Sequence, residues 1–218
     1  MRKMLLVVAT IVALAGLTGT AKADPTTYTG ADNGVSSLAQ MTNSVAAESV
    51  FVAAASGLNV ITFETAVPAD VSIAGGSITN NSGCGALCGF NTTPGGSYFL
   101  SLYGGSATFS FTTPISAFGL YITGLQTDLV PQETLTFSDG SSETINTPSA
   151  VNGGGAFIGF TDAGKSITSV SYNATNDIVA LDDVLYGSAA TPEPNSLILL
   201  GSGLLAAVGA FRRRFTNS

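Results

Sequence analysis

Residues 133–146 read ETLTFSDGSSETIN, and this stretch shows the pattern on which the fold prediction rests. Two runs rich in Thr, Phe, Leu and Ile, Glu133–Ser138 and Ser142–Asn146, flank a short polar segment. Runs of this composition favour β-strands. Asp139-Gly140 lies between them, where a tight hairpin turn needs a positive φ that glycine adopts without strain. The stretch therefore predicts an antiparallel β-hairpin.

Short runs of the same kind recur along most of the chain. Each is rich in Phe, Tyr, Ile, Val and Thr and is bounded by Gly, Pro, Asn or Asp. Because no helical pattern separates them, they predict a mainly β fold, an antiparallel β-sandwich of jelly-roll type. Besides the two hairpin strands, we expect strands at Leu58–Glu64, Ser97–Tyr103, Ala107–Thr112, Ile115–Thr123, Gly155–Thr161, Ser166–Asn173 and Ile178–Tyr186.

The N-terminal residues have the three parts of a secretory signal peptide. Arg2 and Lys3 precede an apolar run, Met4–Leu17, and Ala21-Lys22-Ala23 supplies small residues for cleavage. We therefore expect residues 1–23 to be removed on export. The alternative is a retained anchor helix, which is disfavoured because the run is shorter than the roughly 20 residues of a membrane span.

The C-terminal residues combine a Pro-Glu-Pro triplet, an apolar run and a basic cluster. The three parts are Pro192-Glu193-Pro194, Leu197–Phe211 and Arg212-Arg213-Arg214. An uncharged run of this length is marginal for a membrane span, and the arginines favour a cytoplasmic position for the extreme C-terminus. We expect a transmembrane helix here, with the body of the protein on the outer side of the membrane.

This arrangement resembles the PEP-CTERM sorting signal of Gram-negative bacteria, with the parts in the order typical of the family. The resemblance implies that a membrane transpeptidase, the exosortase, recognises the tail and cuts near the triplet. It further implies an exported protein with a transient inner-membrane anchor, destined for the cell surface or for an extracellular matrix of exopolysaccharide or biofilm. It covers about the last 27 residues and does not bear on what the body does.

Between the two ends lies the expected body. Apolar residues at three- and four-residue steps predict one helix over Ser36–Ala55, ending at Gly57 as a left-handed cap, after a polar stretch that reaches Asn33. Gly75–Gly96 predicts a long surface loop. The expected segments are thus a signal peptide (1–23), a polar segment with a helix (24–57), a β-sandwich domain (58–190) and a sorting segment (191–218).

The charge of the exported part is strongly negative. The whole chain has a formal net charge of −7, and from Asp24 to Ala190 thirteen acidic residues face one basic residue, Lys165. Such a body repels phosphate backbones, which excludes nucleic acid as a partner. Attraction to divalent cations or basic polymers stays open, beside the simpler interpretation that the charge keeps an exported protein soluble.

Cys84 and Cys88 are the only cysteines and fall within the expected loop. An exported chain with two cysteines favours pairing them in a disulfide. The ring is small, so the bond should constrain the loop locally. A redox site is disfavoured because the two-residue spacing of thioredoxin-type motifs is absent, and zinc is disfavoured because two sulfurs have no histidine to join them.

The chain contains no histidine and no tryptophan. The first absence excludes a Ser-His-Asp triad and a histidine general base. The second removes the most common sugar-stacking ring, although tyrosines could substitute. We therefore predict that the body is not an enzyme and is a non-catalytic module that binds extracellular polysaccharide or a surface protein. The alternative is a secreted carbohydrate-active enzyme with two paired carboxylates, which no pattern marks.

The last expected strand places acids in an apolar sequence, DIVALDDVLYG (Asp177–Gly187). Alternation puts Asp182 on one face and Asp183 on the other, so one of them is buried whichever face points inward. A buried carboxylate needs a cation or several N–H donors. Since the body has a single basic residue, two sources remain, the backbone amides of a loop or a calcium ion.

A structural calcium ion is the more specific of these two hypotheses. Sandwiches commonly lay their first and last strands near each other, and calcium binds several carboxylate and carbonyl oxygens. The stretches Ile61–Glu64 and Ala180–Gly187 also resemble the edges of carbohydrate-binding jelly rolls that hold such an ion. The predicted ligands are Glu64, Asp177, Asp182 and Asp183.

Overall fold

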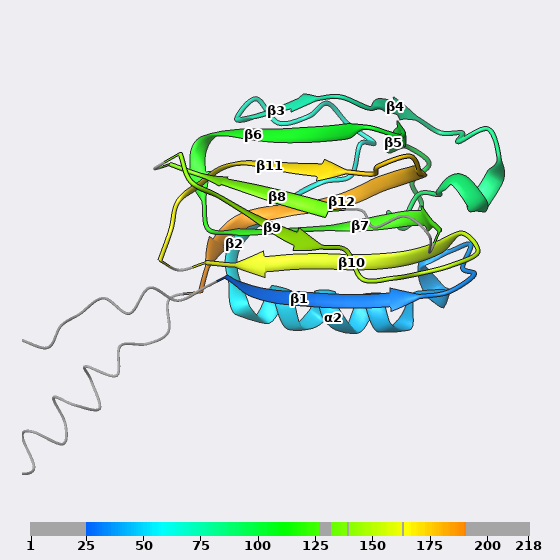
Figure 1. Cartoon of the computed structure of the whole chain (residues 1–218), viewed down its shortest axis with the longest axis horizontal. Coiled ribbons are helices and arrows are strands. Elements are labelled where there is room, and N and C mark those ends of the chain that lie inside the picture. Colours follow the sequence, from blue (N-terminus) through cyan, green and yellow to red (C-terminus); the bar gives the residue numbers. More distant parts are fainter. Residues whose placement is uncertain (1–24, 127–131, 139, 163, 191–218) are drawn as a thin grey trace, which may run out of the picture.

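The computed structural model describes residues 25–126, 132–138, 140–162 and 164–190. These residues form an antiparallel β-sandwich with one α-helix on its outside (Figure 1), so the expected fold class is confirmed. The expected signal peptide and transmembrane sorting helix lie outside the described residues. Within the part of the chain that is described, no helix has the length and apolar character needed to cross a membrane.

The larger sheet has seven strands. They are β1 (Thr26–Asp32), β2 (Ala55–Ile61), β4 (Ser77–Thr79), β5 (Phe99–Tyr103), β7 (Ala117–Leu125), β10 (Gly154–Thr161) and β12 (Ile178–Ala189). Their order is β1-β10-β7-β12-β5-β4. The N-terminal part of β12 pairs with β5, and its C-terminal part, from Val184, pairs with β2. The expected closeness of the strand before Glu64 to the last strand is therefore confirmed.

The smaller sheet has five strands and covers the inner face of the larger one. They are β3 (Val71–Ala74), β6 (Ser106–Ile115), β8 (Gln132–Phe137), β9 (Ser142–Asn146) and β11 (Ile167–Asn173), in the order β3-β6-β11-β8-β9. The hairpin predicted from residues 133–146 is confirmed as the β8–β9 pair. Gly140 has a φ of +81°, and its amide donates to the Phe137 carbonyl at 2.9 Å. Asp139 lies outside the described residues.

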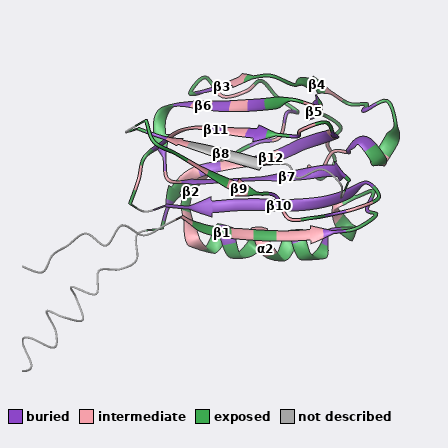
Figure 2. Ribbon diagram, viewed as in Figure 1, coloured by how far each residue is buried: buried purple, intermediate pink, exposed green. Residues whose placement is uncertain are grey.

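The main core lies between the two sheets. All residues of β7 and β10 are buried (Figure 2), because one face of each strand meets the smaller sheet and the other is covered from outside. Aromatic rings from both sheets meet in this core, among aliphatic side chains. The centroid of the Phe118 ring lies 5.6 Å from that of Phe109 and 5.8 Å from that of Phe160. Burial of this apolar surface is the principal source of stability.

The outer cover is the helix α2 (Thr42–Ala54), which packs over β1 and β10 (Figure 1). Its Phe51 ring lies over Gly119 of β7 and Gly159 of β10, which are register partners. A Cβ atom at Gly119 would lie 3.3 Å from Cε1 of Phe51, and one at Gly159 would lie 3.0 Å from its Cδ2. The two glycines therefore leave the space that Phe51 fills.

The helix is shorter than the sequence predicts, and the predicted bounds Ser36–Ala55 are wrong at both ends. Residues 38–40 form a separate 3-10 helix, η1 (Leu38–Gln40), and α2 begins only at Thr42. At the other end Ala55 already pairs with β12, so strand pairing ends the helix. Gly57 does have a positive φ of 58°, but it lies within β2 and caps no helix.

Three strands have no counterpart in the sequence prediction. β1 is part of the stretch expected to be merely polar, β3 precedes the expected loop, and β4 lies inside Gly75–Gly96. That loop prediction is therefore wrong over Ser77–Thr79. Because β1 pairs with β10 and α2 packs on both, residues 26–54 are part of the same packed body as the sandwich.

Candidate functional site

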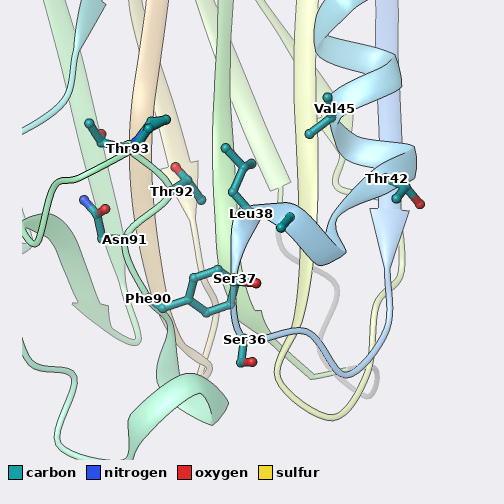
Figure 3. A pocket seen from close by; sticks show the side chains of 11 residues that line it. Ser36, Ser37, Leu38, Thr42, Val45, Phe90, Asn91, Thr92 and Thr93 are labelled. Carbon is teal, nitrogen blue, oxygen red and sulfur yellow. The ribbon is translucent and has the colours of Figure 1, made fainter.

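An open groove of about 710 Å³ lies on the outer face of the larger sheet, beside the start of α2. One wall is formed by residues 36–39 together with Thr42 and Val45, and the other by Phe90–Pro94. Figure 3 shows Val45 pointing from α2 toward the groove and Phe90 projecting from the facing loop. The groove therefore joins two segments that are about fifty residues apart in the sequence.

The lining of the groove is neutral. None of the described residues that line it carries a charge, although the body around it is acidic. Hydroxyl and amide side chains are mixed with apolar ones, which is the composition of sites that orient a small ligand by a few hydrogen bonds over an apolar surface. The polar members are Ser36, Ser37, Thr42, Asn91, Thr92 and Thr93, and the apolar members are Leu38, Ala39, Val45, Phe90 and Pro94.

Phe90 is fixed to the sheet through its backbone. Its amide donates to Oγ1 of Thr123 in β7 at 2.8 Å, and the same hydroxyl donates to the Phe90 carbonyl at 2.8 Å. Its half-buried ring packs against the second apolar cluster, which includes Tyr121 and Phe157 beneath α2. The aromatic wall of the groove is therefore held in place before any ligand arrives.

Two adjacent aspartates of β12 hold the loop 90–98 at Thr92 and Thr93. Oδ2 of Asp182 accepts hydrogen bonds from the Thr92 amide at 2.7 Å and from the Thr93 amide at 3.2 Å. The carboxylate of Asp183 accepts from the hydroxyls of the same threonines, at 2.9 and 2.6 Å. With two longer contacts from the threonine hydroxyls to Oδ2 of Asp182, these hydrogen bonds connect the last strand to one wall of the groove.

A bulge allows both aspartates to reach the same loop. The register between β12 and β7 shifts between Asp182 and Leu185, and Asp183 has a φ of +43°. The strict alternation that placed the two side chains on opposite faces is therefore wrong at this point. A backbone with positive φ is strained for most residues and is best tolerated by Asn and Asp.

Asp182 is the most perturbed acid of the site. It is 1% exposed, and its Oδ1 has no hydrogen-bond partner among the described residues. Burial, together with the negative charge of Asp183, raises the pKa of Asp182 to about 7 despite the hydrogen bonds from Thr92 and Thr93. Its neighbour Asp183 is half-buried.

Glu64 holds the far end of the same loop. Its Oε1 accepts hydrogen bonds from the amides of Ser97 and Tyr98, both at 2.6 Å, and from the side-chain amide of Asn91 at 3.1 Å. Glu64 follows β2, the neighbour of β12, so it approaches the loop from the same side of the body. Three of the four residues predicted as calcium ligands therefore act as acceptors for one loop.

The structure does not gather all four predicted calcium ligands. Asp177 precedes β12 at its opposite end, where its carboxylate accepts from the amides of Gln126 at 2.9 Å and Ile178 at 2.8 Å. In the described ranges, no group of three or more His, Cys, Asp or Glu residues is placed to hold a metal ion. The other hypothesis drawn from the sequence is that backbone amides of a loop bind the buried acids. Such amides donate to Asp182 and to Glu64. Calcium binding by Asp182 and Asp183 stays a prediction.

The predicted disulfide joins Cys84 and Cys88, whose Cα atoms are 5.6 Å apart. It spans the 3-10 helix η2 (Gly85–Cys88), directly before the loop 90–98. The backbone here lies close to β7, since a Cβ at Gly124 would come within 2.6 Å of the Cys88 carbonyl carbon. The bond therefore constrains the segment from which Phe90 enters the groove wall.

The Cys88→Ser variant should lose about 2 kcal/mol of unfolding free energy, because a ring of five residues removes little chain entropy from the unfolded state. Urea denaturation of the exported protein measures this loss. Cys84→Ser is the matched control and should cost about the same. A loss beyond about 5 kcal/mol for either variant would contradict a purely local role of the bond.

The groove itself could not be found from the sequence. Ser36–Ala39 is expected there to be helical, and Phe90–Pro94 falls in the middle of the expected loop. The one local signal is FNTTP, an aromatic residue followed by three hydrogen-bonding residues and a proline. Its meaning depends on the acceptors of β12, which lie about ninety residues further along the chain.

Comparison with known proteins identifies the tail. The family model of the PEP-CTERM protein-sorting motif matches residues 190–214, which include the triplet, the apolar run and the arginines predicted for it. The chain is thus a protein that carries a PEP-CTERM sorting motif, and this motif implies export, exosortase processing and a membrane-associated sorting tail. No curated protein matches the sequence.

Among solved structures, the chain is similar to family 29 carbohydrate-binding modules. One such module has 11% sequence identity and a TM-score of 0.39, with 64% of this chain and 96% of that chain covered. A variant of the module CBM29-2 complexed with mannohexaose has 11% identity and a TM-score of 0.40, with 62% and 97% covered.

Proposed function

We propose that the body of this exosortase-sorted protein is a non-catalytic module that binds a neutral polysaccharide of the cell surface or extracellular matrix. The observation that carries the proposal is the uncharged groove beside α2, with its volume of about 710 Å³. This volume lies within the range typical of small-ligand sites, enough for a few sugar rings.

The lining matches the chemistry of a sugar. A pyranose ring has apolar C–H faces and a rim of hydroxyls, so it is bound by a ring or aliphatic surface together with neutral hydrogen-bonding groups. Phe90, Leu38 and Pro94 offer the apolar surface, and Asn91, Thr93 and Ser37 offer the hydrogen bonds. A hydroxyl-rich neutral ligand would meet partners on both walls.

The charges around the groove favour a neutral polymer over an anionic one. Asp182 and Asp183 lie directly behind Thr92 and Thr93, and the described residues that line the groove include no lysine or arginine to offset them. An anionic polysaccharide would be repelled by this local field and by the acidic body as a whole. A glycan without charged groups carries no such cost.

The Phe90→Ala variant should bind the polysaccharide at least roughly tenfold more weakly, since the loss of a central aromatic contact costs more than about 1.4 kcal/mol. Affinity electrophoresis in gels that contain neutral glucans, mannans or the host's own exopolysaccharide measures the change. Tyr103→Ala, which removes an exposed ring outside the groove lining, is the matched control and should bind normally.

The melting temperature of each variant shows whether the fold is intact. Leu38→Ser, on the opposite wall, should also weaken binding. Because Leu38 and Phe90 lie on different segments, weaker binding by both variants is not explained by a structural effect of Phe90→Ala alone. Unchanged retardation of both groove variants, with the wild-type protein binding, would place the site elsewhere. If the wild-type body binds no polysaccharide in the panel, the proposed function is wrong.

A secreted carbohydrate-active enzyme is the second candidate, and one observation favours it. Asp182 and Asp183 are adjacent carboxyl groups in different environments, and the pKa of Asp182 is raised to about 7, as in pairs that act as acid and base. Against it, Asp182 is covered by the Thr92 and Thr93 amides, which would have to move before a substrate could reach it. Release of reducing sugar that Asp182→Asn abolishes would favour the enzyme.

A further inference from the structure

The side of the body formed by α2, β1 and β2 has its acids turned inward. Residues 25–63 contain two charged residues, Asp32 and Glu48. The Glu48 carboxylate accepts a hydrogen bond from the Tyr121 hydroxyl at 2.7 Å, and Asp32 accepts from the amide and hydroxyl of Ser44 at 2.9 and 2.7 Å. This side, the α2 side, therefore exposes a neutral surface on an otherwise acidic body.

The solvent-facing surface of α2 carries no charged residue among its exposed positions and is largely apolar. Val50 and Val52 are 58% and 44% exposed, and the exposed Val45 lies on the same helix. The other exposed residues of the helix are uncharged, namely Thr42, Asn43, Ala46, Ser49 and Ala53, and Val60 of β2 is also exposed. A surface helix in a soluble domain normally carries charged residues on this side, so the composition of α2 indicates that its surface is covered at some stage.

The sorting tail leaves the body at the C-terminal end of α2. The Ala190 amide donates to the Ala54 carbonyl at 2.8 Å, and Ala189 pairs with Ala55 (Figure 1 shows the end of β12 beside the start of β2). Six residues, 191–196, separate Ala190 from the apolar run that begins at Leu197, and they span at most about 20 Å. The helix is itself about 20 Å long.

We propose that the outer surface of α2 rests on the lipid bilayer while the sorting tail is attached, with Val50 and Val52 at the level of the headgroups. An apolar helix surface gains free energy at the membrane interface, and the absence of exposed charge lets an acidic body approach anionic lipid there. The short tether keeps lipid beside α2 at a high effective concentration, whereas a second copy of the chain would have to be recruited. The proposal rests on the membrane association of the tail and not on polysaccharide binding.

The test uses the full chain in vesicles of phosphatidylethanolamine and phosphatidylglycerol. An environment-sensitive fluorophore is attached through Val50→Cys, since the two native cysteines are joined in a disulfide. Ser72→Cys, on an exposed position of β3 in the other sheet, is the matched control. The label at position 50 should show blue-shifted emission and should be quenched by headgroup-linked quenchers, whereas the label at position 72 should behave as in water.

A second variant distinguishes contact of α2 with the lipid from attachment of the chain to the membrane through its tail. Val52→Glu, which places a charge on the α2 surface, should return the label at position 50 to water-like emission while the chain still floats with the vesicles. Equal, water-like emission at positions 50 and 72 in the floated protein would overturn the proposal. So would a shielded label at position 50 that lipid quenchers do not reach, because that result indicates a second protein copy as the cover.

Discussion

The Asp182→Asn variant should be more stable than the wild-type protein at pH 8, by at most about 4 kcal/mol, and should lose most of the pH dependence of stability between about pH 4 and 7. The upper bound follows from a pKa raised from its ordinary value of 3.8 to about 7, at 1.36 kcal/mol per pKa unit. Denaturant titrations at a series of pH values measure the effect.

The sign follows from proton binding in the two states. Well below pH 4 the Asp182 carboxyl is protonated in both the folded and the unfolded chain. Burial of the neutral group then costs no ionisation free energy, and the free energy of unfolding is at its highest with respect to this residue. As the pH rises toward 7, the unfolded chain releases this proton while the folded chain retains it, and stability falls. An asparagine in its place can still accept from the Thr92 and Thr93 amides and never acquires a charge.

Asp183→Asn is the matched control for this titration. It removes the negative charge that contributes to the shift but leaves Asp182 in place, so the inflection should persist at a lower pH. Asp32 produces no change in the same range. Burial alone would raise its pKa, but hydrogen bonds from Ser44 and Asn43 lower it below the ordinary value, so its contribution is lost only below about pH 4.

The same experiment tests the calcium prediction. A calcium ion bound at Asp182 and Asp183 would stabilise the charged form of Asp182 and move the inflection to lower pH, and EDTA would reverse the shift. A wild-type profile that is flat between pH 4 and 7 without calcium would contradict the environment described for Asp182.

The Phe51→Ala variant should lose about 3–5 kcal/mol of unfolding free energy, the usual cost of removing a buried phenyl ring. Phe51 is fully buried between α2 and the sheet, and its ring contacts those of Tyr28 and Phe157, with centroids 5.8 and 5.7 Å away. Because Gly119 and Gly159 beneath the ring have no side chains, neighbouring groups are poorly placed to fill the resulting cavity. Urea denaturation followed by circular dichroism measures the loss.

Val52→Ala is the matched control, since Val52 follows Phe51 in the helix but points to solvent. It should change the stability by less than about 0.5 kcal/mol. A Gly159→Ala variant should destabilise for the converse reason, because the new methyl group would lie 2.9 Å from the Phe157 ring and 3.0 Å from that of Phe51. A Phe51→Ala variant as stable as the control would mean that α2 is not held by this contact.

Sequence patterns predict the strands that are buried on both faces better than the edge of the sheet. Ala117–Leu125 and Gly154–Thr161 are apolar runs, so composition alone marks them as strands, and the β8–β9 turn is marked by its glycine. The sequence does not reveal β1, because its partner β10 and its cover α2 lie elsewhere in the chain and its residues, TTYTGAD, include no large aliphatic side chain. Its strand state depends on tertiary contacts and not on local propensity.

The candidate site, too, could be predicted only in part. The acids Glu64, Asp182 and Asp183 stand out in the sequence because they are charged residues next to apolar strands. What they bind could not be predicted, since the amides of Thr92 and Ser97 carry no compositional signal. The bulge at Asp183, which turns both aspartates toward one loop, likewise depends on the pairing of β12 with β7 and β2.

The position of β12 also determines how the body withstands mechanical load. A pull on a tail held in the membrane enters the sandwich through Ala190 and runs along β12. This strand is hydrogen-bonded on one edge to β7 and on the other to β5 and then β2. Force along the strand axis therefore loads many hydrogen bonds together in shear and does not open them one at a time. A pull on the body should thus leave it folded while it is still tethered.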